Sequence, residues 1–337
     1  MFVTATDSLR FLTNWRFRVV WLKDKKVAGK CYCMHTTNYH EPVMLEACLD
    51  GLAIKPGGTY VDVTFGGGGH SRAILERLEG GRLLVFDQDA DAKANADALN
   101  DRRLTFIAAN FRHLKRYLRL YAIKEVDGIL ADLGISSHQI DTPERGFSTR
   151  FDAELDMRMN QQAPVTAAQI VNEYPEEKLH RILGMYGEVT NARTLAGAIV
   201  SARLNRPMKT VNDLKMVLQR YAPRNRENKY FAQVFQALRI EVNEELKVLE
   251  EFLEQVPDAL APGGRLVVMS YHSLEDRLVK NFINKGKFHG DVEKDLFGNE
   301  QKPLQAITRK PIEAFAEEVS RNPRARSAKL RIAEKIE

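Results

Sequence analysis

The sequence has little cysteine and no long apolar run, and each absence excludes a class of protein. Three of the 337 residues are cysteine, namely Cys31, Cys33 and Cys48. Three thiols cannot build a disulfide framework, and no second Cys-x-x-Cys half completes a zinc site, so we predict neither disulfides nor a metal. No apolar run approaches the roughly 20 residues of a membrane helix. We therefore expect a cytoplasmic protein with no membrane partner.

The chain also has no net charge once its first residues are set aside. The formal net charge is +5, but residues 1–33 hold seven basic and two acidic side chains, so the remainder nets to zero. Two interpretations of this segment stay open: a basic arm that touches nucleic acid, or an extension outside the fold, disordered or not native, with Met34 as the genuine start. We favour the extension because recognisable organisation begins only after Met34.

What is present is a regular alternation of strand-like and helix-like segments. Stretches rich in β-forming residues are each followed by a helical pattern. The expected strands are 59–65, 82–87, 104–108 and 126–133, and the expected helices are 71–78, 90–99 and 111–121. Strands that alternate with helices imply an α/β fold with a parallel, doubly wound sheet.

The alternation stops at residue 141 and resumes near residue 239. The stretch 141–238 contains no convincing strand, and we expect five helices at 165–173, 176–184, 192–204, 211–221 and 230–238. After it we expect a helix over 242–255 ended by Pro257, a strand over 265–270, a helix over 274–284, and a closing antiparallel pair at 304–309 and 328–335. The prediction is a sheet domain of residues 34–140 and 239–337 with an all-helical insertion at 141–238.

A glycine-rich loop, Thr64 to His70, lies between the first expected strand and its helix. Glycine permits positive φ angles and a close approach of the backbone to a ligand. The helix that follows directs bare N–H groups into the crevice at the carboxyl ends of the strands. A plain tight turn does not need four consecutive glycines, so we favour a binding loop, with His70 capping the helix or bordering the ligand.

Two carboxylates at strand ends flank the same crevice. Asp87 ends the second strand, where it can accept hydrogen bonds from two ribose hydroxyls. Asp132 ends the fourth strand and faces the reactive part of the crevice; binding backbone N–H groups in a turn is its alternative role. Phe111, after the third strand, lies against an adenine ring or in the core. A nicotinamide oxidoreductase also fits this layout, although the loop is not Gly-x-Gly-x-x-Gly.

The residue types at the strand ends suit methyl transfer to an amine. Such a transfer is an in-line displacement that needs the nucleophile held close and aligned. An anionic Asp132 would stabilise the positive charge that develops on an exocyclic amine and could accept its proton. Tyr271 and His272 follow the fifth strand, where a stacking or general-base role is open, and Ser273 to Asp276 resembles a capping box.

Nine ordered segments carry a family resemblance. They are HEPVMLEA (40–47), VDVTFGGGGHS (61–71), DGILADLGISSHQID (127–141), ERGFS (144–148), LDMRM (155–159), FQALRIEVNEEL (235–246), APGGRL (261–266), HSLEDR (272–277) and NPRARSAKLRIAE (322–334). Together they resemble the RsmH family, formerly MraW, of bacterial 16S rRNA cytosine-N4 methyltransferases. The resemblance implies a class I methyltransferase fold, Rossmann-like, with S-adenosyl-L-methionine as cofactor. It also implies N4-methylation of a decoding-centre cytidine, 1402 in the usual rRNA numbering.

The resemblance also implies site residues, position by position. The family's cofactor contacts fall on Gly68, Gly69, His70, Asp87, Phe111, Asp132 and Gln139. We take Asp132 and His272 as the candidate catalytic residues. Two positions depart from the family pattern: Val63 replaces a common glycine, and His138 replaces a common proline. The proton acceptor stays open, because Asp132-Leu133-Gly134-Ile135 stands where other amino-methyltransferases have Asp/Asn-Pro-Pro-aromatic.

The expected partner is 16S rRNA or the small ribosomal subunit, and a homodimer is an open alternative. Phosphate contacts need basic side chains, and the target base must be splayed out to reach the crevice. Within the helical insertion we take as RNA-binding candidates Arg203, Arg206, Arg224, Arg226 and Lys229. The basic run Arg112 to Arg119 is interpreted as a solvated face. A non-catalytic S-adenosylmethionine-binding ribosome assembly factor is the alternative function.

Overall fold

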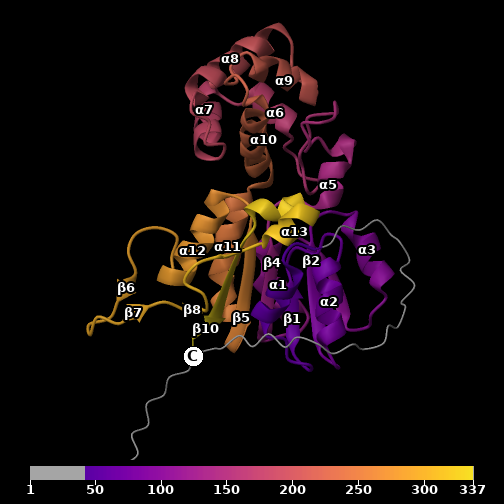
Figure 1. Ribbon diagram of the computed structural model, residues 1–337, viewed down its shortest axis with the longest axis vertical. Helices are drawn as coiled ribbons and strands as arrows, with labels where there is room; N and C mark the ends of the chain where they lie inside the picture. Colours follow the sequence, from indigo (N-terminus) through magenta and orange to yellow (C-terminus); the bar gives the residue numbers. More distant parts are fainter. Residues whose placement is uncertain (1–41, 337) are drawn as a thin grey trace, which may run out of the picture. The chain divides into compact units, whose positions relative to one another are not determined.

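The computed structural model describes residues 42–336, and a mostly parallel sheet lies at its centre (Figure 1). The interpretations placed on residues 1–33 lie outside the described residues. Across residues 42–336, no helix is both long and apolar enough to cross a bilayer. All described residues belong to one compact unit.

The order of the strands creates the crevice. The main sheet runs β3–β2–β1–β4–β5–β10–β8, with β9 also paired to β10. The strands are β1 (Thr59–Asp62), β2 (Arg82–Asp87), β3 (Leu104–Ala108), β4 (Val126–Asp132), β5 (Leu260–Ser270), β8 (Leu304–Ala306), β9 (Ile312–Glu313) and β10 (Lys329–Lys335). β1 to β5 pair in parallel, and β10 runs antiparallel to β5. The chain leaves β1 toward β2 and returns on its other side as β4, so the crevice opens at the carboxyl ends of β1 and β4.

Each face of the sheet buries its own apolar layer. Alternate residues of β4 point to opposite faces: Ile129 and Ala131 belong to one cluster and Leu130 to the other. The first cluster includes residues of α4 (Leu114–Leu120), α11 (Glu245–Ala259) and α12 (Ser273–Lys285). The second includes residues of α1 (Leu45–Leu52), α2 (Gly69–Arg77) and α3 (Ala92–Leu99). The predicted α/β sheet with helices on both faces is confirmed.

Five helices follow a short α5 (Ser137–Asp141) and pack on one another. They are α6 (Ala167–Glu173), α7 (Glu176–Met185), α8 (Ala192–Asn205), α9 (Val211–Gln219) and α10 (Glu227–Asn243). Each contributes to a third apolar cluster with residues such as Ile170, Leu179 and Leu195. Thr166 and Thr210 start α6 and α9 as capping boxes, in which the side chain and the backbone satisfy each other's N–H groups.

The expected end of the helix at Pro257 is wrong. α10 continues to Asn243, Glu244 adopts a left-handed conformation (φ 49°), and α11 runs from Glu245 through Pro257 to Ala259. Pro257 lies in the last turn, where the apolar face of the helix stays packed on the sheet and one backbone hydrogen bond is lost. β5 therefore begins at Leu260, and a shift of register against β4 accommodates Pro262 and the two glycines after it.

The C-terminal elements close the sheet. β10 pairs with β8 through Ala333 and Ala306, so the predicted closing antiparallel pair is present. Between α12 and β8 lies a hairpin of β6 (Glu293–Lys294) and β7 (Glu300–Gln301). A short helix, α13 (Ala316–Arg321), precedes β10. These elements extend the parallel sheet by an antiparallel edge, which leaves the carboxyl ends of β1 and β4 open to ligand.

Candidate active site

The glycine loop after β1 tolerates no side chain at two positions. Gly68 has a φ of 75°, and a Cβ there would lie 2.8 Å from the Phe65 ring. A Cβ on Gly69 would lie 2.4 Å from Cγ of Pro42. Because both contacts are closer than carbon atoms can approach, the loop needs glycine to reach the N-terminus of α2. These two glycines are the predicted cofactor contacts of the loop.

Asp62, at the end of β1, supports the loop from below and was not singled out in the sequence. Its Oδ2 accepts from the Ser71 hydroxyl at 2.6 Å, and its Oδ1 accepts from the Thr64 backbone N–H at 3.1 Å. Burial raises the pKa of Asp62, while the Ser71 hydrogen bond counteracts it. A carboxylate inside the apolar segment VDVTF was the available signal, since a buried acid must have partners.

Asp87 lies at the end of β2, as predicted for a ribose acceptor. Its Oδ2 accepts from the Gly66 backbone N–H at 2.8 Å and its Oδ1 from the Asp89 backbone N–H at 2.8 Å. Each oxygen keeps further acceptor capacity. Burial raises the pKa of Asp87 to about 6, against the two backbone hydrogen bonds that lower it. The carboxylate is thus fixed in orientation and still able to bind hydroxyl donors.

A cavity of about 130 Å³ borders this carboxylate. It is lined by Gly66, Asp87, Asp89, Asp91, Ala92, Asn95, Ser136, His138 and Gln139. The lining joins the glycine loop, the end of β2 and the start of α5, three elements brought together by the order of the strands. Its polar walls and the absent side chains of the glycine loop fit a nucleoside with ribose hydroxyls directed at Asp87.

Asp132 ends β4, on the neighbouring strand. Its backbone N–H donates to Thr64 Oγ1 at 2.6 Å, which ties the two strand ends together. Its Oδ1 accepts from the Tyr271 hydroxyl at 2.8 Å, and its Oδ2 lies 3.8 Å from Nδ1 of His70. Burial raises the pKa of Asp132 to about 6, although His70 and the Tyr271 hydrogen bond favour the charged form. With 24% of the side chain exposed, the carboxylate can still reach a substrate.

His70 is buried and held from one side. Its Nε2 lies 3.0 Å from the Val43 carbonyl, which can only accept, so the proton is on Nε2. Nδ1 then faces Asp132. Gly68 is the N-cap of α2 and no side chain caps that helix, so the capping alternative for His70 is wrong and its place beside the ligand stays a prediction.

Phe111 and Gln139 have partners inside the protein. Phe111 is half-buried and meets Phe252 of α11 edge to face, with ring centroids 5.2 Å apart. Gln139 accepts from the Ser136 backbone N–H at 3.1 Å and donates to Asp89 at 2.8 Å. Gln139 therefore shapes the cavity wall, in which His138 also lies.

Arg145 was missed as a site residue, although it lies in the ERGFS segment. Only 6% of its side chain is exposed, and its Nη1 is 2.8 Å from Asp89 Oδ2. Its Nη2 donates to the carbonyls of Arg158 and Met159 at 3.0 Å. A buried, fully bonded guanidinium of this kind fixes the LDMRM segment beside the cavity wall.

His272 is the N-cap of α12. Its Nδ1 accepts from the Glu275 backbone N–H, and Glu275 accepts from the His272 backbone in return. The capping box thus begins one residue earlier than the predicted Ser273, whose hydroxyl instead donates to Glu188 at 2.9 Å. His272 does not contact Asp132 through any recorded bond; Tyr271, its neighbour, does.

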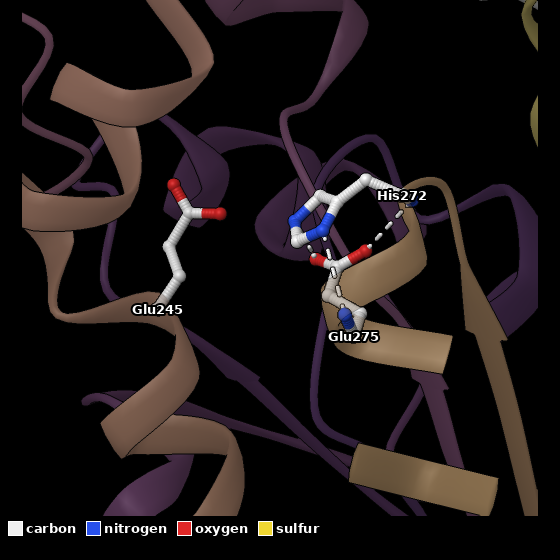
Figure 2. Close-up of side chains that lie close together, drawn as sticks. All are labelled: Glu245, His272 and Glu275. Atoms are coloured by element: carbon white, nitrogen blue, oxygen red, sulfur yellow. Dashed lines mark hydrogen bonds and ion pairs between the residues drawn. The ribbon is translucent and has the colours of Figure 1, made fainter. Parts of the chain in front are cut away.

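Among residues 42–336, one group of side chains has metal-like spacing. Donor atoms of Glu245, His272 and Glu275 lie within 4.8 Å of one another, and Figure 2 shows both carboxylates facing the imidazole ring. Arg239 occupies both Glu245 oxygens, at 2.8 and 3.0 Å. Because His272 Nδ1 accepts a hydrogen bond, the proton is on Nε2, which leaves no lone pair there for a cation. The contacts therefore fit a buried charge cluster better than a metal centre.

Some of the predicted RNA-binding residues are bonded within the protein, and others are exposed. Arg203 donates to the carbonyls of Val171 and Tyr174 at 3.0 and 2.8 Å, which satisfies the end of α6. Arg206 is 77% exposed and lies 3.4 Å from Asp213. Three exposed basic residues lie at or near the start of α10, namely Arg224, Arg226 and Lys229. By contrast, Arg112 and Lys115 are held in ion pairs with Glu251 and Asp258, so these two face acidic partners.

Comparison with known proteins identifies the family. The model of the MraW methylase family matches residues 37–336. The ribosomal RNA small subunit methyltransferase H of Cytophaga hutchinsonii is 62% identical over 297 residues, covering 88% of this chain and 99% of the relative. The protein of the same name from Flavobacterium johnsoniae is 59% identical over 302 residues, covering 89% and 99%.

Similar solved structures are more distant. An rRNA methylase from Streptococcus thermophilus matches with a TM-score of 0.38 and 13% identity, covering 90% of this chain and all of that one. TrmN from Thermus thermophilus matches with a TM-score of 0.39 and 13% identity, covering 87% and 48%. At these TM-scores the assignment rests on the sequence matches. They cover nearly the whole length of the relatives, and the chain belongs to the MraW methylase family.

Proposed function

We propose that this chain transfers a methyl group from S-adenosyl-L-methionine to a cytidine of 16S rRNA, at N4 of cytidine 1402 in the usual numbering. The observation that carries the proposal is the half-buried Asp132 carboxylate at the end of β4, tied to the glycine loop through Thr64. The relatives' name, ribosomal RNA small subunit methyltransferase H, supports the RNA as substrate. Such a substrate implies the cytoplasm as the compartment.

The residues that would hold the cofactor are those of the glycine loop and the two strand ends. Gly68 and Gly69 let the backbone approach, and Asp87 offers acceptors to two ribose hydroxyls. Phe111 offers the exposed part of its ring, and His70 borders the loop beside Asp132. Gln139 contributes to the cavity wall. When bound, S-adenosylmethionine supplies a methyl group made electrophilic by its sulfonium.

Asp132 would stabilise the reacting amine and accept its proton. As the N4 nitrogen of cytosine forms its bond to carbon, it becomes positive and must then lose a proton. An anionic carboxylate in a half-buried position stabilises that charge more than water does and can take the proton. The hydroxyl of Tyr271 holds this carboxylate at Oδ1, and the ring of His70 lies 3.8 Å from Oδ2. His272, the second candidate, would act only through its neighbours, because it caps α12.

The helical insertion is proposed to bind RNA. We keep the division into a sheet domain of residues 34–140 and 239–337 and an insertion at 141–238, with a separate apolar cluster as its support. Among the candidate residues, Arg224, Arg226 and Lys229 are exposed and clustered in sequence. Arg206 is also exposed, whereas Arg203 is used within the helices. Arginines with free guanidinium groups suit phosphate contacts.

The test is methyl transfer from labelled S-adenosylmethionine to small ribosomal subunits and to naked 16S rRNA, followed by nucleoside analysis. We expect N4-methylcytidine with wild-type protein. Asp132→Asn should lower kcat by about 100-fold, as expected for loss of one charge-stabilising group. The matched control is Asp127→Asn on the same strand, at its amino end, where Asp127 binds Lys55 and Thr59.

The outcomes separate the functions. Methylation of a different base or atom would overturn the proposed specificity. Cofactor binding without any transfer to either RNA form would instead support the non-catalytic assembly factor. Hydride transfer from a nicotinamide cofactor would support the oxidoreductase. Equal loss of activity in both aspartate variants would remove the special role of Asp132.

A further inference from the structure

Tyr271 donates a hydrogen bond directly to the carboxylate of the reaction centre. Its hydroxyl donates to Asp132 Oδ1 at 2.8 Å, across 139 positions of sequence. Burial and the neighbouring Asp132 charge raise the pKa of Tyr271 well above its ordinary value of 10.0, so the hydroxyl stays a neutral donor. A donor fixed on one carboxylate oxygen leaves the other oxygen for a substrate proton.

The tyrosine is itself held in place. Its backbone N–H donates to Glu275 Oε2 at 3.0 Å, and the same oxygen accepts from the His272 backbone at 3.4 Å. Its ring lies against Gly134, where an added Cβ would meet Cδ2 of Tyr271 at 3.5 Å. Glu275 is 4% exposed in its side chain, so it cannot move without breaking the start of α12.

The support continues to the junction of α10 and α11. His272 Nε2 lies 3.2 Å from Glu275 Oε1 and, as Figure 2 shows, on the side of the ring that faces Glu245. Glu245 is bound through both oxygens to Arg239 of α10. The chain of contacts therefore runs from the last insertion helix through α11 and α12 to Tyr271.

We propose that Tyr271 is a positioning residue for methyl transfer: its hydroxyl holds the Asp132 carboxylate in the geometry and charge state that the amine requires. This inference rests on the proposed function above. Tyr271 stabilises the charged carboxylate because a hydrogen bond to the ionised form favours that form. Glu275 and His272 act through Tyr271 by fixing its backbone, and they do not touch the substrate.

Other groups near Asp132 also influence its charge. They are His70 of α2, Asp62 of β1 and Glu275 of α12. The charges of Asp62 and Glu275 raise the pKa of Asp132, whereas His70 lowers it. Removal of the Tyr271 hydroxyl leaves these groups in place, so any shift in the Asp132 titration is assigned to the hydrogen bond.

The test compares Tyr271→Phe with wild type in protein without cofactor. With 13C-labelled aspartate, NMR follows the Asp132 carboxyl, whose signal is assigned with Asp132→Asn. We expect its titration midpoint to rise by about one pH unit in Tyr271→Phe. The acid limb of the pH–kcat profile should move to higher pH by the same amount, and KM for RNA should stay within about threefold.

The matched control is Tyr174→Phe, which removes a hydroxyl that donates to Glu241 at 3.0 Å in the insertion. It should shift neither the Asp132 midpoint nor the acid limb. An Asp132 midpoint unchanged in a folded Tyr271→Phe would overturn the proposal, whatever the activity. A wild-type protein that methylates no cytidine would instead overturn the proposed function, and the NMR titration would still report on the contact.

Discussion

Two aspartates, at the ends of the strands that flank β1, are ionised at a cost to the fold. Burial raises the pKa of both Asp87 and Asp132 to about 6. The folded chain therefore binds protons at these residues at pH values where the unfolded chain has released them. Below pH 3.8, the pKa of an aspartate in the unfolded chain, each of these groups stabilises the fold. That contribution is lost as the pH rises through about 6, the pKa in the folded chain. At neutral pH the site holds charges that serve function rather than stability.

Replacing the carboxylate of Asp132 by an amide should therefore stabilise the protein at high pH. We expect Asp132→Asn to raise the free energy of unfolding by up to about 3 kcal/mol at pH 8, because the amide is never charged. The gain should vanish below about pH 3, where wild-type Asp132 is protonated in both the folded and the unfolded chain. Urea unfolding across this pH range measures the difference.

Asp127 supplies a control of opposite sign. Its pKa is lowered, since the hydrogen bonds from Thr59 and Lys55 outweigh its burial. Asp127→Asn should thus destabilise the protein at pH 8 and have less effect at low pH. If both variants changed stability in the same direction at every pH, the burial argument for Asp132 would be wrong.

At the scale of elements, the loop between β1 and α2 needs glycine, because two of its positions have no room for a side chain. Gly69→Ala places a Cβ 2.4 Å from Pro42, a ring that cannot rotate away. We expect the loop or the segment before α1 to shift, with about 1–3 kcal/mol of destabilisation and at least about tenfold weaker cofactor binding. Thermal unfolding and calorimetric titration with S-adenosylmethionine measure both effects.

Gly57→Ala is the matched control for this change. Gly57 precedes β1, and a Cβ there meets nothing within 4 Å. It should leave cofactor affinity unchanged and stability within about 0.5 kcal/mol. Retention of full affinity in Gly69→Ala would contradict the need for glycine in this loop.

At the scale of the molecule, the charge that matters is local. Residues beyond 33 have no net charge, so RNA binding must come from patches such as Arg224, Arg226 and Lys229. Reversal of all three to glutamate should weaken binding to small subunits at least about tenfold at low salt. Each lost phosphate contact should reduce the slope of log K against log salt by about 0.7–0.9. Filter binding over a salt series measures it.

The control is a charge reversal of exposed basic residues outside the helical insertion. Arg102 and Lys124 are exposed and precede β3 and β4, at the amino ends of the strands. Their reversal should leave RNA affinity nearly unchanged, and neither set should alter cofactor binding. A similar loss of RNA affinity in both sets would indicate nonspecific attraction and contradict a dedicated RNA surface.

Much of the fold could be predicted because it is local. β2 and β3 end at Asp87 and Ala108 as expected, since short apolar runs between turns determine strands in parallel sheets. The positions of Asp87 and Asp132 at strand ends followed from the same pattern. The nine ordered segments determined the family, which the match over residues 37–336 confirms.

Tertiary structure decided which side chains meet. The contact between Tyr271 and Asp132, and the bonds of Arg145 to Asp89 and Met159, join residues far apart in sequence. The first of these contacts depends on β4 pairing with β5 and on the register shift after Val126, which a one-dimensional pattern does not contain. The sequence by itself determined the elements and the family, because periodicity and composition are local. The pairing of β4 with β5 brought the Tyr271 hydroxyl to Asp132 and so fixed the position of its carboxylate.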